Sequence, residues 1–319
     1  MCHAIGNDMT RLGWIDALKG FLILLVIWSH AVQTCVPDYF STITYKTTSC
    51  FYMAAFFFVS GIVLRLGRHG VETLPGKMRR LLVPYFAWWG VNSLFCASAL
   101  WFLLTLAQCV AACVICSVVV PEKKNWLWMC IGGFLLVVLT LAGRNLSFDV
   151  RHFAKYYPFF LGGYLLAARK SLVAPCGGFS TIGKYEKMLL MFSTAAFVLG
   201  LVGAVLLVFT DKAFHLYKIL ISWFGCVSLL MIFRLLPERW AIVGVLRWIG
   251  MKTLGLYAVH IFLLIICGRY VSHWPISLLF IALSCASMIF IVVMEHIPVA
   301  AWLFLGNSPK SISMFTLKK

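Results

Sequence analysis

Long apolar stretches alternate with short polar segments along almost the whole chain. A membrane-spanning helix needs about 20 predominantly apolar residues, and about ten stretches meet this criterion. The pattern predicts an all-α integral membrane protein: one polytopic domain over residues 1–319, a bundle of about ten transmembrane helices with no soluble domain. The expected spans are residues 14–34, 51–66, 81–98, 101–120, 126–143, 153–168, 188–209, 214–233, 248–268 and 276–297.

Composition supports this class and excludes a soluble protein. The chain is 62% hydrophobic and only 12% charged, whereas a soluble domain is about 45–50% apolar and about 25% charged. The formal net charge of +17 would also suit a nucleic-acid-binding protein. However, the cations form short clusters between apolar stretches, as in cytoplasmic loops, so we expect no nucleic-acid partner.

The distribution of Lys and Arg predicts the orientation. With the N-terminus in the cytoplasm, 19 of these residues fall on the cytoplasmic side and 7 on the other side. Cytoplasmic loops carry the excess of positive charge. Both termini are therefore expected in the cytoplasm, in agreement with an even number of spans.

The 12 cysteines give no metal-binding pattern. Most lie in apolar stretches, where cysteine behaves as a small hydrophobic residue. Cys35 and Cys50 flank one outward loop, and both a disulfide and two free thiols agree with their spacing. We expect no bound metal.

The first apolar stretch carries unusual polar residues. A charged side chain inside the membrane costs at least about 2.5 kcal/mol, yet Lys19 lies in this stretch, Asp16 precedes it and His30 ends it. Eleven residues separate Lys19 from His30, which places both on one helix face about 16 Å apart along the axis. Asp16 is close enough to pair with Lys19.

Two interpretations of this face remain open. Lys19 can extend to the inner headgroups, and His30 can hydrogen-bond a loop carbonyl, with no further role. Alternatively, a cation at the inner end and an imidazole at the outer end suit a molecule with an anionic head and a long thin arm that passes through the bundle.

The stretch "RLGWIDALKGFLILLVIWSH" resembles the opening helix of the acyltransferase-3 family, bacterial membrane-bound O-acyltransferases that modify cell-surface carbohydrates. Each similarity is weak alone, but together their order and spacing over nearly the whole chain are specific. The further similar segments are "FYMAAFFFVSG" (51–61), "KMRRLLVPYFAWW" (77–89), "LWFLLTL" (100–106), "FFLGGYLL" (159–166) and "IGMKTLGLYAVH" (249–260).

The resemblance implies an activity and its substrates. The donor would be cytoplasmic acyl-CoA, with acetyl-CoA favoured, and the acceptor a hydroxyl of a surface carbohydrate or lipid-linked glycan outside a bacterial cytoplasmic membrane. An alcohol needs a base to react at neutral pH, and His30 is the candidate. It would act directly as a base or carry the acyl group as an acyl-imidazole.

The resemblance also suggests binding roles for other residues, each with a structural alternative. Lys19, Arg79 and Arg80 would bind the phosphates of CoA, although Arg79 and Arg80 also suit ordinary anchors at the inner surface. Ser60 would line the path of the thin arm, or else bond to its own helix.

His260 and Trp101 are the remaining candidates. His260 lies inside the ninth predicted span, either as a second catalytic or positioning group near His30 or as a neutral histidine bonded within the bundle. Trp101 begins the fourth span, either stacked on a sugar ring or closing over the acyl arm, or else as part of an interfacial aromatic belt.

The chain departs from the family pattern at two places. The family often has Arg where Lys19 stands, and Lys keeps the charge but loses bidentate phosphate binding. Tyr52 and Ala54 replace a His and a Pro that commonly begin the second helix, which puts the role of that His in doubt here.

Two other functional classes fit the same spans: a transporter or flippase of a surface-glycan precursor, and a scaffold subunit without chemistry. No repeat symmetry supports the transporter. Membrane lipids are expected partners, and a homodimer is possible. The acyl group, the acceptor and the oligomeric state stay open.

Overall fold

The computed structural model describes residues 12–67, 71–93, 100–119, 127, 131, 148–174, 178–207 and 211–306. Regular secondary structure in these residues is entirely helical, and they contain no strand. The predicted all-α class is therefore confirmed.

The helices are long, and short 3₁₀ turns join several of them. They are α1 (Gly13–Cys35), α2 (Ile43–Thr48), α3 (Tyr52–Leu66), α4 (Leu74–Ser93), α5 (Trp101–Val119), α7 (Phe148–Leu166), α8 (Lys184–Leu206), α9 (Asp211–Leu235), α10 (Ala241–Met251), α11 (Thr253–Val271), α12 (Ile276–Glu295) and α13 (Pro298–Leu305). The 3₁₀ turns are Tyr39–Ser41, Val71–Thr73, Lys170–Leu172 and Phe179–Thr181.

Six helical segments within the described residues are long and apolar enough to cross a membrane. The helices α4 and α7 do not meet this criterion; each carries charged residues and an internal proline. Of the predicted spans, six therefore have a counterpart that meets this criterion. They are α1, the segment Ile43–Leu66, α8, the segment Leu216–Leu235 of α9, α11 and α12.

Where the structure describes them, the predicted spans overlap helices. Residues 126–143 lie almost entirely outside the described residues. The span expected over 248–268 begins later than expected, because Lys252 separates the end of α10 from α11, whose residues Thr253–Val271 are apolar and long enough to cross a membrane. The break keeps α10 against α1, and Lys252 pairs with Glu295 of α12. The apolar pattern hid this break because it continues on both sides of Lys252.

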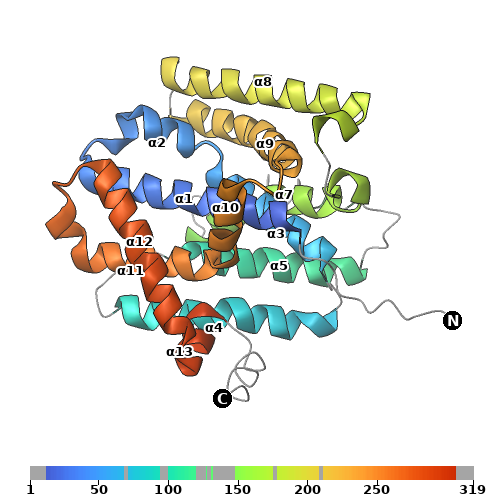
Figure 1. The fold of residues 1–319 in the computed structure, drawn as a ribbon. Helices are drawn as coiled ribbons and strands as arrows, with labels where there is room; N and C mark the ends of the chain where they lie inside the picture. Colours follow the sequence, from blue (N-terminus) through green and yellow to red (C-terminus); the bar gives the residue numbers. More distant parts are fainter. Residues whose placement is uncertain are drawn as a thin grey trace.

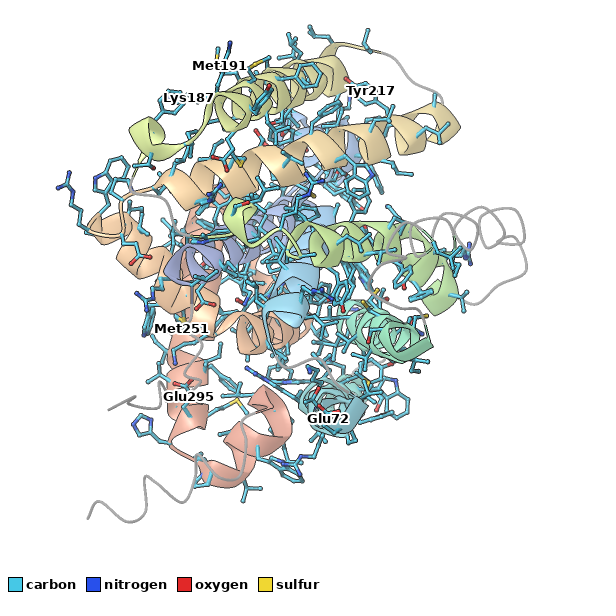
Figure 2. The ribbon with its side chains drawn as sticks, turned by 90° about the vertical axis from the view of Figure 1, so that its right-hand side faces the viewer. Glu72, Lys187, Met191, Tyr217, Met251 and Glu295 are labelled. Atoms are coloured by element: carbon cyan, nitrogen blue, oxygen red, sulfur yellow. The ribbon has the colours of Figure 1, made fainter. Side chains whose placement is uncertain are left out.

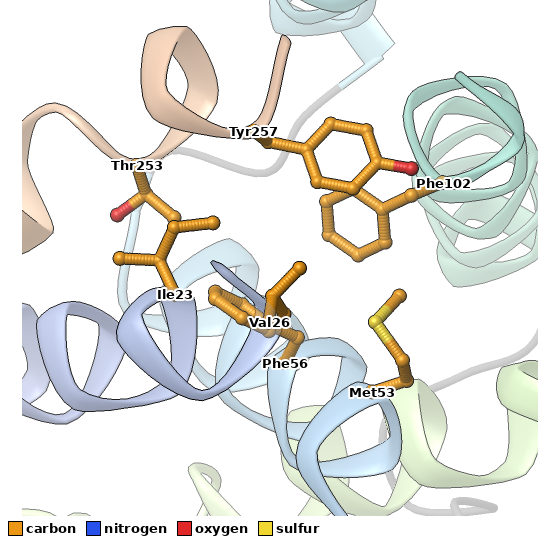
Figure 3. Close-up of a pocket in the computed structure, with 7 residues that line it drawn as sticks. All are labelled: Ile23, Val26, Met53, Phe56, Phe102, Thr253 and Tyr257. Atoms are coloured by element: carbon orange, nitrogen blue, oxygen red, sulfur yellow. The ribbon is translucent and has the colours of Figure 1, made fainter. Parts of the chain in front are cut away.

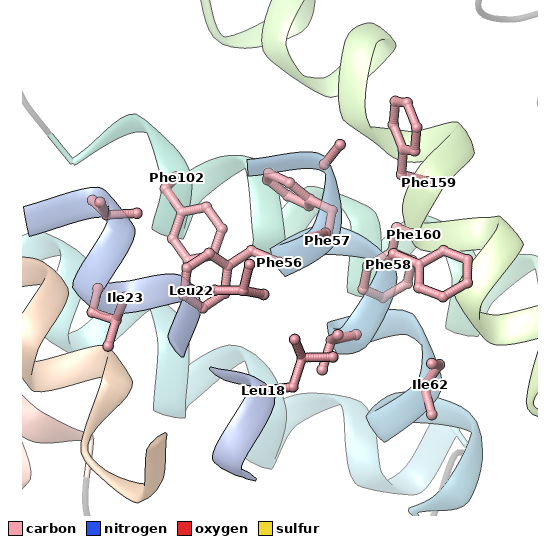
Figure 4. Packing of buried hydrophobic residues seen from close by; sticks show 14 of the residues in the cluster. Leu18, Leu22, Ile23, Phe56, Phe57, Phe58, Ile62, Phe102, Phe159 and Phe160 are labelled. Atoms are coloured by element: carbon pink, nitrogen blue, oxygen red, sulfur yellow. The ribbon is translucent and has the colours of Figure 1, made fainter. Parts of the chain in front are cut away.

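The helix α1 lies in the centre of the bundle (Figure 1). The helices α9 and α8 lie on one side of it, with α8 outermost, and α5, α4 and α13 lie on the other side. Much of α1 is buried, as are the phenylalanines that follow one another in α3. Figure 4 shows Leu18 and Leu22 of α1 in one cluster with Phe56, Phe57 and Phe58 of α3.

Glycines allow two pairs of helices to approach closely. A Cβ atom on Gly20 of α1 would lie 1.9 Å from the carbonyl oxygen of Leu246 in α10. A Cβ atom on Gly61 of α3 would lie 1.9 Å from the carbonyl oxygen of Phe160 in α7. Small residues permit such backbone contacts between membrane helices, and they fix α1 and α3 at the centre of the bundle.

The outer surface of α8 is apolar. Met191, Phe192, Leu199 and Leu206 are among its exposed side chains, and Figure 2 shows Met191 on the side of α8 that faces away from the bundle. Exposed apolar residues on a long apolar helix suit contact with lipid.

Cys35 and Cys50 are free thiols. The sulfur of Cys50 donates instead to the carbonyl oxygen of Lys46, at 3.0 Å. The disulfide that the sequence left open is not formed.

Candidate active site

One face of α1 carries the polar residues that the sequence singled out. Asp16, Lys19, Ile23, Val26 and His30 repeat every three or four residues, which places them along one stripe. Lys19 Nζ lies 3.4 Å from Asp16 Oδ1, and Asp16 is only 2% exposed. The predicted pairing of these two residues is confirmed.

The two candidate histidines meet at the other end of this stripe. His30 Nδ1 lies 3.2 Å from His260 Nε2, and the ring centroids are 5.2 Å apart. His260 is fully buried and His30 is half-buried. The structure therefore brings together two residues that are 230 positions apart in the chain.

The hydrogen bonds of this pair determine which ring nitrogens carry protons. The carbonyl of Leu256 lies 2.6 Å from His260 Nδ1, and a carbonyl can only accept, so this nitrogen carries a proton. In a neutral His260 ring, Nε2 must then accept from His30 Nδ1. A neutral His30 carries one N–H, and on Nδ1 this single N–H serves both His260 Nε2 and the carbonyl of Val26, one turn earlier. With both rings neutral, His30 Nε2 is left with its lone pair.

A small apolar pocket lies between α1, α3, α5 and α11 (Figure 3). Its residues Val26 and Tyr257 precede His30 and His260 by about one helical turn. On α11, Thr253, Tyr257 and His260 share one face, as Ile23, Val26 and His30 do on α1. On each of these two helices, the residues that line the pocket therefore share one face with the histidine. The pocket is lined by Ile23, Val26, Met53, Phe56, Phe102, Thr253 and Tyr257.

Two tyrosines border the histidine pair. The ring of Tyr257 meets that of His260 edge-on at 6.0 Å, and its hydroxyl hydrogen-bonds the backbone of Phe102. Tyr52 hydrogen-bonds the side chain of Ser29, the residue before His30. The sequence did not assign either tyrosine to the site, although Tyr257 lies three residues before His260 and so shares its helix face.

Trp101 lies near this end of the bundle, with its ring stacked against His152. The centroids of these rings are 4.0 Å apart, and that of Tyr156 is 5.6 Å from Trp101. Phe102, the next residue, lies 4.9 Å from Tyr257. One face of Trp101 is thus covered by a histidine that the sequence did not single out.

The remaining candidates lie away from the histidine pair. The hydroxyl of Ser60 donates to the carbonyl of Phe56 at 2.8 Å, which is the bond within its own helix that the sequence left open. Arg79 and Arg80 are exposed on α4, a helix that packs mainly against α5 and α13 rather than α1. The described residues contain no group of three or more side chains suited to a metal ion.

Comparison with known families decides the classification. Residues 12–97 and 88–296 match the acyltransferase domain of the acyltransferase-3 family, which covers most of the chain. The chain belongs to the acyltransferase-3 family. No curated protein and no solved structure matches it.

Membership in the acyltransferase-3 family, together with six apolar helices, makes the chain a multi-pass membrane acyltransferase. The first matched segment contains His30 and the second contains His260. Both halves of the match therefore contribute one ring to the histidine pair.

Proposed function

We propose that the protein transfers an acetyl group from cytoplasmic acetyl-CoA to a hydroxyl of an extracytoplasmic carbohydrate or lipid-linked sugar in a bacterial cytoplasmic membrane. The observation that carries this proposal is the contact of His30 with His260, bonded in turn to Leu256. This chain of hydrogen bonds holds His30 with a lone pair on Nε2. A fixed imidazole lone pair is what a general base requires.

The proposed topology has about ten spans, with both termini and Lys19 toward the cytoplasm. The excess of Lys and Arg on that side supports it. The phosphates of the donor would meet Lys19, and its thin thioester arm would extend through the pocket toward His30. Trp101 would border the acceptor sugar. Arg79 and Arg80, exposed on α4, would attract the donor's phosphates from a greater distance.

The reaction would proceed by proton transfer at His30. Nε2 takes the proton of the acceptor hydroxyl while the hydroxyl oxygen forms a bond to the thioester carbonyl carbon. The carbon–sulfur bond then breaks, and the departing thiolate takes the proton from the imidazolium, so His30 returns to its neutral form. In the variant of this scheme with an acyl-imidazole, Nε2 attacks the thioester carbon first, and the carbon–sulfur bond breaks to release CoA thiolate. The acceptor hydroxyl then attacks the acyl carbon, its bond to Nε2 breaks, and the hydroxyl proton goes to the thiolate.

The test uses purified protein in nanodiscs with radiolabelled acetyl-CoA. Release of CoA together with label on an added carbohydrate acceptor supports the proposal. Label on the protein that hydroxylamine removes and that His30→Ala lacks supports the acyl-imidazole. A folded protein that neither binds nor turns over acetyl-CoA, but moves a lipid-linked glycan across a liposome membrane, would instead be a flippase.

Replacing His260 tests its positioning role. Leucine at this position removes the acceptor for His30 Nδ1, and we expect kcat to fall about 10–100-fold with little change in KM for acetyl-CoA. Glutamine keeps an acceptor oxygen near the place of Nε2 and should restore most of the rate. Equal rates for the leucine variant, the glutamine variant and wild type, measured by CoA release, would refute the role.

A further inference from the structure

Two lysines lie at the end of the bundle where the histidine pair is found. The helices α3 and α7 run parallel, because Phe57 stacks on Tyr156 at 4.8 Å and Arg65 Nη1 donates to the Tyr164 hydroxyl at 3.0 Å, eight residues further along both helices. The start of α7, with Lys155, therefore lies beside the start of α3.

The same end of α3 is also the end where His30 lies. Tyr52 begins α3 and hydrogen-bonds Ser29, next to His30. Lys218 of α9 lies there too, because Ser222, one turn later, donates to the carbonyl of Cys50. Lys155 precedes Tyr156, which stacks on Phe57 of α3, and Lys218 precedes by one turn the serine that bonds to Cys50 just before α3. Two cations on different helices thus share one region at the histidine end.

Neither lysine has a carboxylate partner among the described residues. Three ion pairs in the described residues involve other cations, those of Lys19, Arg234 and Lys252. Both residues are half-buried, and their ammonium groups lie near aromatic rings instead. Lys155 Nζ lies 5.2 Å from the ring centroid of Tyr156, and Lys218 Nζ lies 4.4 Å from that of Phe214 and 5.8 Å from that of Tyr45.

This arrangement favours an anion from outside the protein. Partial burial weakens the hydration of each ammonium, and a like charge nearby adds repulsion. Aromatic faces offset part of this cost, but a carboxylate or phosphate placed between the lysines would remove the repulsion and supply charge-assisted hydrogen bonds.

We propose that Lys155 and Lys218 bind an anionic group, a carboxylate or phosphate, of the acceptor glycan. This inference rests on the proposed acyltransferase function, because it assigns a substrate class to the same site. Tyr156 connects the two lysines with the histidine pair. Its ring lies near Lys155 Nζ and near the ring of Trp101. Phe102, the residue after Trp101, contacts Tyr257 beside the histidine pair. The anion would hold the glycan while a neighbouring hydroxyl meets His30.

The test measures glycan binding rather than turnover. The full-length protein in phosphatidylcholine nanodiscs is titrated with three fluorescent probes of equal length: an oligogalacturonate, a glycerol-phosphate oligomer and a neutral oligogalactose. We expect at least one charged probe to bind about tenfold more tightly than the neutral probe. Lys155→Ala and Lys218→Ala should each abolish most of this preference, and the arginine variants should keep it.

The matched control is Arg269→Ala, which removes an exposed cation at the end of α11 on the histidine side. Its binding of the charged probe should equal that of wild type. His30→Ala should also bind the charged probe, so the anion site is measured even in a protein that does not transfer an acyl group. Equal affinities for charged and neutral probes in wild type, or a preference unchanged by both alanine variants, would overturn the proposal.

The phosphate of a lipid headgroup is the other anion that offers the two lysines the same interactions. Nanodiscs with phosphatidylglycerol separate the two: if the lysines serve only lipid anchoring, the alanine variants lose enrichment of this lipid and show no change in glycan binding. That result would also overturn the proposal. Binding of a charged glycan by a wild type that releases no CoA would leave the anion site in place and remove the acyltransferase function.

Discussion

Alanine in place of His30 is expected to lower kcat for acyl transfer by about 10²–10⁴-fold. The substitution removes the Nε2 lone pair, and His260 cannot replace it because its own Nε2 points at the position that His30 Nδ1 occupied. KM for acetyl-CoA should change little, since Lys19 lies about 16 Å away along α1. Initial rates of CoA release by protein in nanodiscs measure both parameters.

His273→Ala is the control for this experiment. His273 is an exposed histidine in the turn after α11, and its loss should leave both kcat and KM unchanged. Thermal unfolding midpoints within a few degrees of wild type would show that His30→Ala is folded. A folded His30→Ala protein with the wild-type rate would exclude the imidazole from the reaction and would leave the histidine pair as a structural contact.

The sequence predicts those parts of the site that lie on one face of a single helix. Lys19 and His30 share a face because of the helical period alone, and the structure places Asp16 beside Lys19 as expected. The contact of His30 with His260 depends on the packing of α11 against α1. No local pattern encodes that packing, so the sequence left two alternatives for His260.

Other features depend on neighbours that sequence patterns do not reveal. A serine in a helix can line a substrate path or hydrogen-bond its own helix, and the folded structure shows that Ser60 donates to the carbonyl of Phe56. His152 reads as an ordinary residue near a helix start until its stacking on Trp101 is seen. The break at Lys252 has no proline, and its cause is tertiary: α10 lies against α1 while α11 continues in another direction.

Leucine in place of Gly250 is expected to prevent the central helices from packing. A Cβ atom at Gly250 of α10 would lie 1.7 Å from the carbonyl oxygen of Asp16 in α1, and the neighbouring atom on that side is backbone, which cannot rotate away. Overpacking of flexible side chains already costs about 1–3 kcal/mol. A clash with backbone should cost more, so α10 must move away from α1 and displace Asp16 and its pairing with Lys19.

The measurement compares two glycines of the same helix. Gly244 also lies in α10, but a Cβ atom there meets no atom within 4 Å. Gly244→Leu should therefore behave as wild type, whereas Gly250→Leu should lower the thermal unfolding midpoint by about 10 °C or more, or give no monodisperse protein on size-exclusion chromatography in detergent. Acetyl-CoA turnover should fall with Gly250→Leu, because Lys19 and His30 lie on the helix that the clash displaces. Equal unfolding midpoints for the two variants would mean that α1 and α10 are not in backbone contact in the membrane.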